Sequence, residues 1–206
     1  MTDARRLLER AADCYEQAGL PLEAARCRER AGTLHPAAVL YERGGDLERA
    51  ADCYARARLV PEAVSCWLRL GRVEEAAGCW EQAGDVVSAA WILVTAARNT
   101  ARARWLVEGD RAEPGVRRTI VRALCRAVEG GGHSALREAL AALDHRQWGT
   151  PQRWAVQAAD LVGRPDLAAQ VFADAFAGGH PAVLAEWREW AERALGGTAG
   201  LPGGAA

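Results

Sequence analysis

Residues 48–57 read ERAADCYARA, and residues 74–85 read EEAAGCWEQAGD. Both stretches contain an alanine pair, a cysteine three residues after the first alanine, and an aromatic residue directly after the cysteine. The pairs begin at Ala50 and Ala76, which are two steps of thirteen residues apart. A fixed period of this kind is the sequence signature of a repeat architecture.

The same pattern extends over seven copies, which cover residues 9–99. Alanine–alanine or alanine–valine pairs begin at Ala11, Ala24, Ala37, Ala50, Ala63, Ala76 and Ala89. The cysteine slot holds Cys14, Cys27, Cys53, Cys66 and Cys79, with Leu40 and Ile92 in the other two copies. A glycine closes five copies, at Gly19, Gly32, Gly45, Gly71 and Gly84.

Each copy predicts one short helix. Its apolar positions fall at i, i+1, i+4 and i+7, which is one face of a helix with 3.6 residues per turn. The glycine stands where a helix C-cap favours a left-handed residue, and Pro21 stands where the next helix begins. A helix of about nine or ten residues is marginal alone in water, so it must stack on its neighbours. The short connections predict consecutive antiparallel helices, and therefore an all-α superhelix, an α-solenoid.

The thirteen-residue register fades after residue 99, whereas the helical pattern continues. We expect transitional helices in 100–129, a break at Gly130–Gly132, a C-terminal cap of longer helices in 133–195, and a disordered tail in 196–206. The expected segments are an amphipathic one from Pro114 to Val128, a helix capped by Ser134 through Leu143, one opening at Thr150, one from about Asp166 to Phe176, and one from Pro181 to Leu195.

Composition bounds the class of protein. The 206 residues carry a net charge of −1, which provides no electrostatic footprint for nucleic acid. The N-terminal residues Met1–Cys14 lack an apolar signal core, and the uncharged apolar stretch Val86–Ala97 falls short of the ~20 residues of a membrane span. Six cysteines without a signal indicate reduced thiols, so we expect a cytoplasmic protein.

The residue inventory argues against an enzyme. The chain has no lysine, which excludes a P-loop and a Schiff-base lysine. Its three serines do not form a G-x-S-x-G elbow, and its four histidines (His35, His133, His145 and His180) have no metal-ligand spacing. We therefore expect no catalytic residue, no cofactor and no metal site.

An arginine repeats two positions after the aromatic slot. It occurs at Arg30, Arg43, Arg56 and Arg69, and the flanking copies hold Gln17 and Gln82. Stacked copies would align these six residues as a stripe along one side of the solenoid, able to grip carboxylates of an acidic peptide. The alternative is that the arginines pair with the glutamates of the preceding slot, which are Glu16, Glu29, Glu42 and Glu81.

Three further patterns favour packing over function. The thirteen-residue spacing puts each cysteine on a separate helix, which is typical of small buried hydrophobes and not of a zinc site. The aromatic slot fills the core, and its polar atoms suggest a half-exposed edge. Trp187 and Trp190 lie one turn apart and are expected to pack on the preceding hairpin, although an exposed remainder would mark an interaction site.

The strings at 48–57 and 74–85 resemble tetratricopeptide-type helical repeats, and similar strings occur in SNAP-like and vesicle-coat solenoids. The stretch 154–177 is also similar to one tetratricopeptide hairpin. Two copies here make 26 residues, against 34 in the tetratricopeptide unit, so the curvature of that family does not carry over. The resemblance implies a scaffold or adaptor, which in bacteria can accompany ATPase or signalling modules.

These observations favour a scaffold or adaptor subunit of the bacterial cytosol that binds another protein along the repeat helices. Two alternatives stay open. The open repeat ends could stack, which would give a self-assembling structural protein. The cysteine slot could act as a thiol-based redox or metal sensor.

Overall fold

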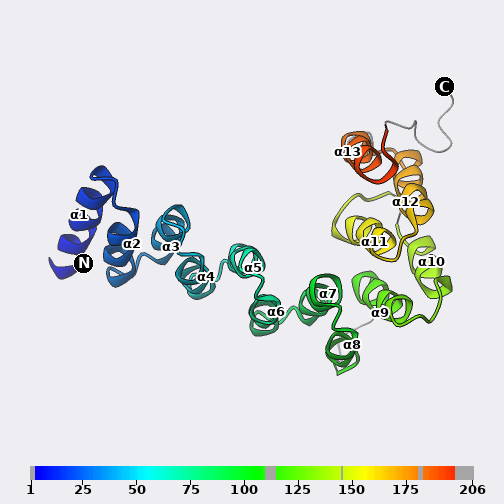
Figure 1. Cartoon of the computed structure of the whole chain (residues 1–206), viewed down its shortest axis with the longest axis horizontal. Coiled ribbons are helices and arrows are strands. Elements are labelled where there is room, and N and C mark those ends of the chain that lie inside the picture. Colours follow the sequence, from blue (N-terminus) through cyan, green and yellow to red (C-terminus); the bar gives the residue numbers. More distant parts are fainter. Residues whose placement is uncertain (1–2, 110–114, 145, 181–182, 198–206) are drawn as a thin grey trace. The chain divides into compact units, whose positions relative to one another are not determined.

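The computed structural model describes residues 3–109, 115–144, 146–180 and 183–197, and Figure 1 traces the chain. The chain is all-α, a helical-repeat solenoid, and has no strand in the described ranges. Its contacts divide it into two compact units, residues 1–92 and 93–206. The border lies inside α7 (Val86–Ala97), and each unit is described by itself.

Unit 1 is built from the thirteen-residue copies. After α1 (Asp3–Gln17), five helices of ten residues follow, as the period predicts: α2 (Pro21–Arg30), α3 (Leu34–Arg43), α4 (Leu47–Arg56), α5 (Val60–Arg69) and α6 (Val73–Gln82). Each packs against the next. Both alanines of the pair have no exposed surface in α2, α3, α4 and α6, because these small side chains let neighbouring helices approach closely.

The connections need only three residues because one residue caps two helices. At the end of α3, the Gly45 N–H donates to the Glu42 carbonyl and the Asp46 N–H donates to the Tyr41 carbonyl. This Schellman motif requires a left-handed residue, and Gly45 has a φ of +82°. Asp46 is then the N-cap of α4, since its carboxylate accepts from the Arg49 N–H.

The aromatic slot is more deeply buried than expected. Tyr41, Tyr54 and Trp67 belong to the core, so the predicted half-exposed edge is wrong for these copies. The tyrosine hydroxyls do not need water, since Tyr41 and Tyr54 each donate to a glutamate of the preceding helix. The core-filling role is confirmed for these three copies, whereas Tyr15 is exposed and Trp80 is half-buried.

Unit 2 contains the end of α7 and the helices α8 (Thr100–Gly109), α9 (Val116–Val128), α10 (Ser134–Ala141), α11 (Thr150–Leu161), α12 (Pro165–Ala177) and α13 (Val183–Leu195). Four of these have twelve or thirteen residues, as expected for longer helices, whereas α10 has only eight.

Helix starts were predicted with mixed success. Thr150 opens α11 as expected, but Ser134 is not a cap: it is the first residue of α10, and His133 takes the N-cap position without a side-chain hydrogen bond. The expected starts at Pro114 and Pro181, and the tail from 198 onward, lie outside the described residues.

Candidate functional site

A ladder of polar side chains connects helices of unit 1. Glu29 of α2 accepts from the Tyr41 hydroxyl of α3 at 2.9 Å and from the Arg56 guanidinium of α4 at 2.5 Å. One copy later, Glu42 of α3 accepts from Tyr54 of α4 at 3.1 Å and from Arg69 of α5. Each glutamate is thus bound by a tyrosine twelve residues later and an arginine twenty-seven residues later.

The surroundings of the glutamate and tyrosine side chains in the ladder shift their pKa values. Burial alone would raise the pKa of Glu29, but hydrogen bonds from Arg56 and Tyr41 outweigh burial, and the pKa lies below its ordinary value. Burial and the hydrogen bond to Glu42 raise the pKa of Tyr54 to about 12. Burial also raises the pKa of Tyr41, so at neutral pH Glu29 is charged and Tyr41 holds its proton, which fixes donor and acceptor in this pair.

The ladder divides the helices into two rows. Arg56 joins α4 to α2, Arg69 joins α5 to α3, and Arg72 at the start of α6 reaches Glu48 of α4 at 2.6 Å. In a single layer, helices two apart would be separated by twice the usual 8–10 Å, too far for these pairs. Helices α2, α4 and α6 therefore form an even row, and α1, α3 and α5 form an odd row; α3 to α6 alternate in this way in Figure 1.

The predicted arginine stripe is consequently split. Arg30, Arg56 and Gln82 belong to the even row, and Gln17, Arg43 and Arg69 belong to the odd row. The expectation of one stripe on one side is wrong, because consecutive copies alternate between the rows.

The six residues also differ in their partners. Arg56 and Arg69 pair with Glu29 and Glu42, as the alternative interpretation predicted, although the contact comes from the helix two positions on and not from the next one. Glu16 forms an ion pair with Arg28. Arg30 and Arg43 are exposed and have no ion pair with any residue that the structure describes.

A groove runs along the even row. Two open hollows of about 490 and 510 Å³ share Ala55 and Arg56 of α4. The first is also lined by Glu29, Arg49 and Asp52, and the second by Arg58, Val60, Cys79, Gln82 and Ala83. Because α2, α4 and α6 all contribute, the groove follows the row, and the Glu29–Arg56 pair crosses it.

The groove offers charges of both signs. Desolvation and the neighbouring Glu48 raise the pKa of Asp52, whose carboxylate has no hydrogen bond or ion pair within the described part of the chain. Arg58 is exposed and is likewise without an ion pair there. This arrangement can hydrogen-bond the backbone and charged side chains of an extended or helical segment.

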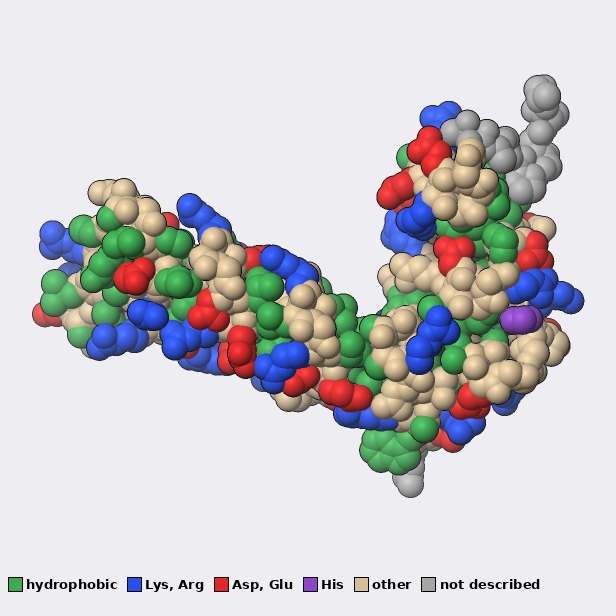
Figure 2. Space-filling model, in the orientation of Figure 1, with side chains coloured by type: hydrophobic (Ala, Val, Ile, Leu, Met, Phe, Trp, Pro, Cys, Tyr) green, Lys and Arg blue, Asp and Glu red, His purple; other side chains and the backbone are tan. Residues whose placement is uncertain are grey.

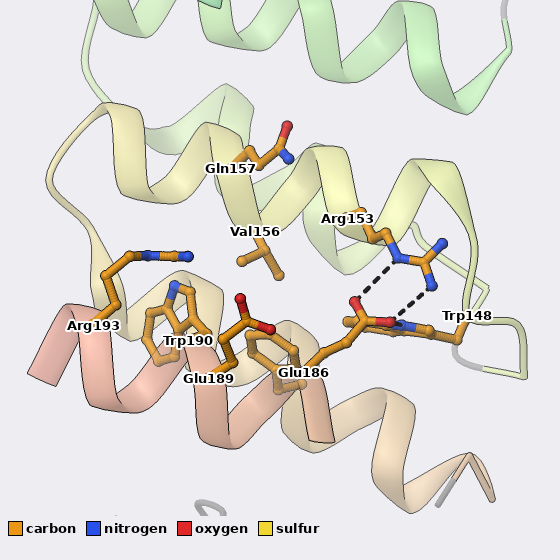
Figure 3. A pocket seen from close by; sticks show the side chains of 9 residues that line it. Trp148, Arg153, Val156, Gln157, Glu186, Glu189, Trp190 and Arg193 are labelled. Carbon is orange, nitrogen blue, oxygen red and sulfur yellow. Dashed lines mark hydrogen bonds and ion pairs between the residues drawn. The ribbon is translucent and has the colours of Figure 1, made fainter. Parts of the chain in front are cut away.

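Unit 2 has a smaller aromatic pocket of about 180 Å³, shown in Figure 3. Its floor includes Phe172, whose ring centroid lies 5.2–5.5 Å from those of Trp148, Trp187 and Trp190. Trp187 and Trp190 are buried, so their predicted packing on the preceding hairpin is confirmed. The cluster belongs mainly to the core of unit 2.

A charge clamp borders this pocket. Arg153 donates twice to Glu186, at 2.8 and 3.1 Å, and the Trp148 indole N–H donates to the same carboxylate at 2.9 Å. The hydrogen bond from Arg153 holds the pKa of Glu186 below its usual range. Sequence reasoning missed this clamp, since its charged partners are 33 residues apart on helices outside the thirteen-residue period.

The cysteine slot is buried at Cys53 and Cys66 and half-buried at Cys27 and Cys79. Burial raises the pKa of Cys53 to about 11 and also raises that of Cys66, so both thiols keep their protons at neutral pH. Cys14 of α1 is exposed. Within the described ranges, no three histidine, cysteine or acidic side chains are grouped so that they could hold a metal ion.

Comparisons with protein-family models, with curated proteins and with solved structures return no match for this chain. Among the described residues, no helix has both the length and the apolar character needed to cross a bilayer.

Proposed function

We propose that this protein is a scaffold or adaptor that binds a segment of another protein along the even row of unit 1. The observation that carries this proposal is the groove of α2, α4 and α6, whose polar walls are held in place by the Tyr–Glu–Arg ladder. A rigid surface loses little side-chain entropy when a partner binds, which favours affinity.

The predicted residues occupy different positions relative to the groove. Gln82 lines it, Arg56 spans it, and Arg30 stands at the end of α2 in the same row. We assign Arg30, Arg56 and Gln82 to the groove partner, whereas Gln17, Arg43 and Arg69 belong to the odd row and do not line the groove. An exposed aromatic supports binding elsewhere: Trp105 of α8, in unit 2, has 69% of its surface exposed.

The proposal assigns no catalytic step to the chain. In the groove Arg56 binds Glu29, and no nucleophile stands beside a general base among the lining residues. The setting that we propose is a bacterial cytosol, where the protein would hold components of an ATPase-associated or signalling system together. Self-assembly stays a second candidate, because α1 exposes Leu7 and Tyr15.

The test is a capture experiment with two matched variants. The groove variant carries Arg58→Glu and Gln82→Ala, and the control variant carries Arg43→Glu and Gln17→Ala on the odd row. All four residues are exposed, so both variants should keep the helicity of the wild type, which circular dichroism checks.

Tagged wild type and both variants are used to capture proteins from the native cytosol, and mass spectrometry identifies what is bound. We expect a stoichiometric partner with the wild type and the control variant, and its loss from the groove variant. Equal capture by all three would contradict the groove. Recovery of the bait alone in every case would contradict the scaffold function.

A further inference from the structure

One copy of unit 1 differs from the others beside the groove. In α4, Ala55 occupies the slot that holds Glu29 in α2 and Glu42 in α3. In the connection that follows α4, Arg58 occupies the slot that is glycine in the other connections of unit 1. Both residues line the hollow of about 510 Å³. The two changes in this copy therefore meet at one place in the groove.

Arg58 has a backbone conformation that costs stability. Its φ of +63° lies in the left-handed region, which is unfavourable for a residue with a Cβ. Glycine makes the same turn without this strain at Gly45 and Gly71. The Arg58 side chain is exposed and has no hydrogen bond or ion pair with the residues that the structure describes. A strained residue whose side chain makes no such bond within the fold points to a role in binding.

The hollow beside Arg58 is suited to a carboxylate. Among the described residues that line it, none is acidic. Arg56 already binds Glu29, so the guanidinium of Arg58 and the amide of Gln82 are the polar side chains left for a ligand. Guanidinium and amide N–H groups are both donors, and a carboxylate accepts from both.

The adjoining hollow of about 490 Å³ offers the opposite charge. Asp52 lines it, is exposed, and has no hydrogen bond or ion pair within the described ranges. The other charged groups there have partners, since Glu29 binds Arg56 and Arg49 lies 3.6 Å from Asp46. The two hollows share two residues of α4, so one segment can pass through both. The unpaired charges of the groove are thus positive in one hollow and negative in the other.

We propose that the groove selects a partner segment with one acidic and one basic side chain, the acidic one bound by Arg58 and Gln82 and the basic one by Asp52. The inference rests on the proposed scaffold function and specifies the chemistry of the bound segment. The six residues from Asp52 to Arg58 correspond to a rise of roughly 9 Å at helical spacing. Three residues of an extended segment span about 10 Å, so we expect the two charged residues three positions apart.

A segment of mixed charge fits the groove better than a uniformly acidic one. A second carboxylate in the segment would lie against Asp52, and like charges across an interface disfavour binding. Figure 2 shows acidic and basic side chains interspersed over the surface of unit 1. The positions of charges in the partner should therefore matter more than its net charge.

The probe is a short peptide, Ala-Glu-Ala-Ala-Arg-Ala, with an acetylated N-terminus and an amidated C-terminus, so that the glutamate is its only carboxylate. One matched peptide replaces the glutamate by glutamine, and another replaces the arginine by glutamate. Binding to the full-length protein is followed in ¹⁵N spectra of the arginine Nε–Hε groups. The signal that disappears in Arg58→Gly belongs to Arg58, and the one that disappears in Arg43→Gln belongs to Arg43.

We expect the probe, at millimolar concentration, to move the Arg58 signal until it saturates. The Arg43 signal should stay in place, because Arg43 is also exposed and unpaired but lies on the odd row. Both matched peptides should bind about fivefold more weakly, which is the effect of one hydrogen-bonded ion pair at an open site.

Two protein variants test the assignment of each charge. In Arg58→Gly, followed at the Gln82 side-chain amide, the probe and the glutamine peptide should bind equally, although this variant loses no stability. In Asp52→Asn, the probe and the two-glutamate peptide should bind equally. Asp52 and Arg58 are both exposed, so the fold should tolerate either change.

A probe that leaves the Arg58 signal in place, equal affinities of the wild type for all three peptides, or equal shifts of the Arg43 and Arg58 signals would overturn the proposal. So would an Arg58 signal that moves with protein concentration alone, because the occupant would then be a second copy. Partner capture that the groove variant loses, found together with any of these results, would support the groove and refute its charge preference. Expected peptide binding with recovery of the bait alone would refute the scaffold function and support the charge preference.

Discussion

At the scale of single residues, the ladder shows how one carboxylate can organise three helices. Glu29 lies on α2 and receives donors from α3 and α4, and its side chain is 29% exposed. Partial burial matters here, because an ion pair between fully exposed groups contributes little. The pairing of the glutamate slot with the arginine slot was visible in the sequence, but the helix that supplies the arginine was not, since that depends on the two-row packing.

The lowered pKa of Glu29 predicts an acid-sensitive contribution to stability. A carboxylate whose folded-state pKa is depressed stabilises the protein above its unfolded-state pKa, near 4.5, and this contribution is lost as pH falls through the folded-state pKa. We expect Glu29→Gln to reduce the free energy of unfolding by about 1 kcal/mol at pH 7. The difference from wild type should shrink below pH 4.5.

Urea denaturation of both proteins between pH 3 and 7 measures this difference. Glu62→Gln is the control, because Glu62 is an exposed carboxylate with no ion pair among the described residues, and it should behave as wild type. A difference between Glu29→Gln and wild type that does not change with pH would contradict the interpretation.

At the scale of one element, the helix-to-helix connection is the most repetitive feature of unit 1. A residue with positive φ occurs every thirteen positions, at Gly19, Gly32, Gly45, Arg58, Gly71 and Gly84. Only the fourth copy uses a residue with a side chain beyond hydrogen, and Arg58 has a φ of +63°. Its Cβ is strained there, as for most L-residues in this region.

Arg58→Gly should therefore stabilise the protein. Relief of the left-handed strain favours the folded state by about 1 kcal/mol, partly offset by the greater freedom of glycine in the unfolded chain. Arg58→Ala is the matched control, because it removes the same charge and keeps the Cβ; it should bring no gain. The midpoint of urea denaturation measures both, and equal effects of the two substitutions would contradict the backbone explanation.

The sequence predicted elements better than contacts between them. The period predicted the helices of unit 1, because the glycine and alanine slots act locally. It did not predict the reach from Arg56 to Glu29, which depends on helices two apart lying side by side. In unit 2 no period relates Arg153 to Glu186, so neither the clamp nor the pocket beside it had a signal in the sequence.

At the scale of the whole unit, stability should vary along the solenoid. Helix α1 packs on α2 and contributes one fully buried side chain, whereas α4 packs on α3 and α5 and is also linked by ion pairs to α2 and α6. In repeat proteins, stability is approximately a sum of terms from nearest neighbours. The end of the row should thus open more often than its middle.

Hydrogen exchange read by mass spectrometry tests this gradient. We expect amides of α1 to exchange at least about tenfold faster than those of α4, after correction for intrinsic rates. The Tyr41–Glu29 and Tyr54–Glu42 bonds should protect the ends of α3 and α4. Uniform protection from α1 to α6 would show that unit 1 opens as one cooperative block.

Because each copy of the repeat is a single helix, the number of copies that precede a helix of unit 1 decides whether it lies in the odd or the even row. Because consecutive copies alternate between the rows, inserting thirteen residues would transfer every later helix of the unit to the opposite row, so that an insertion between α2 and α4 would leave α4 and α6 no longer continuing the row of α2. Inserting twenty-six residues would restore the assignment. A lineage that lengthens such a solenoid and keeps its grooves must therefore add copies in even numbers. The smallest repeating unit in the sequence is one copy, but the smallest unit that preserves the rows is two.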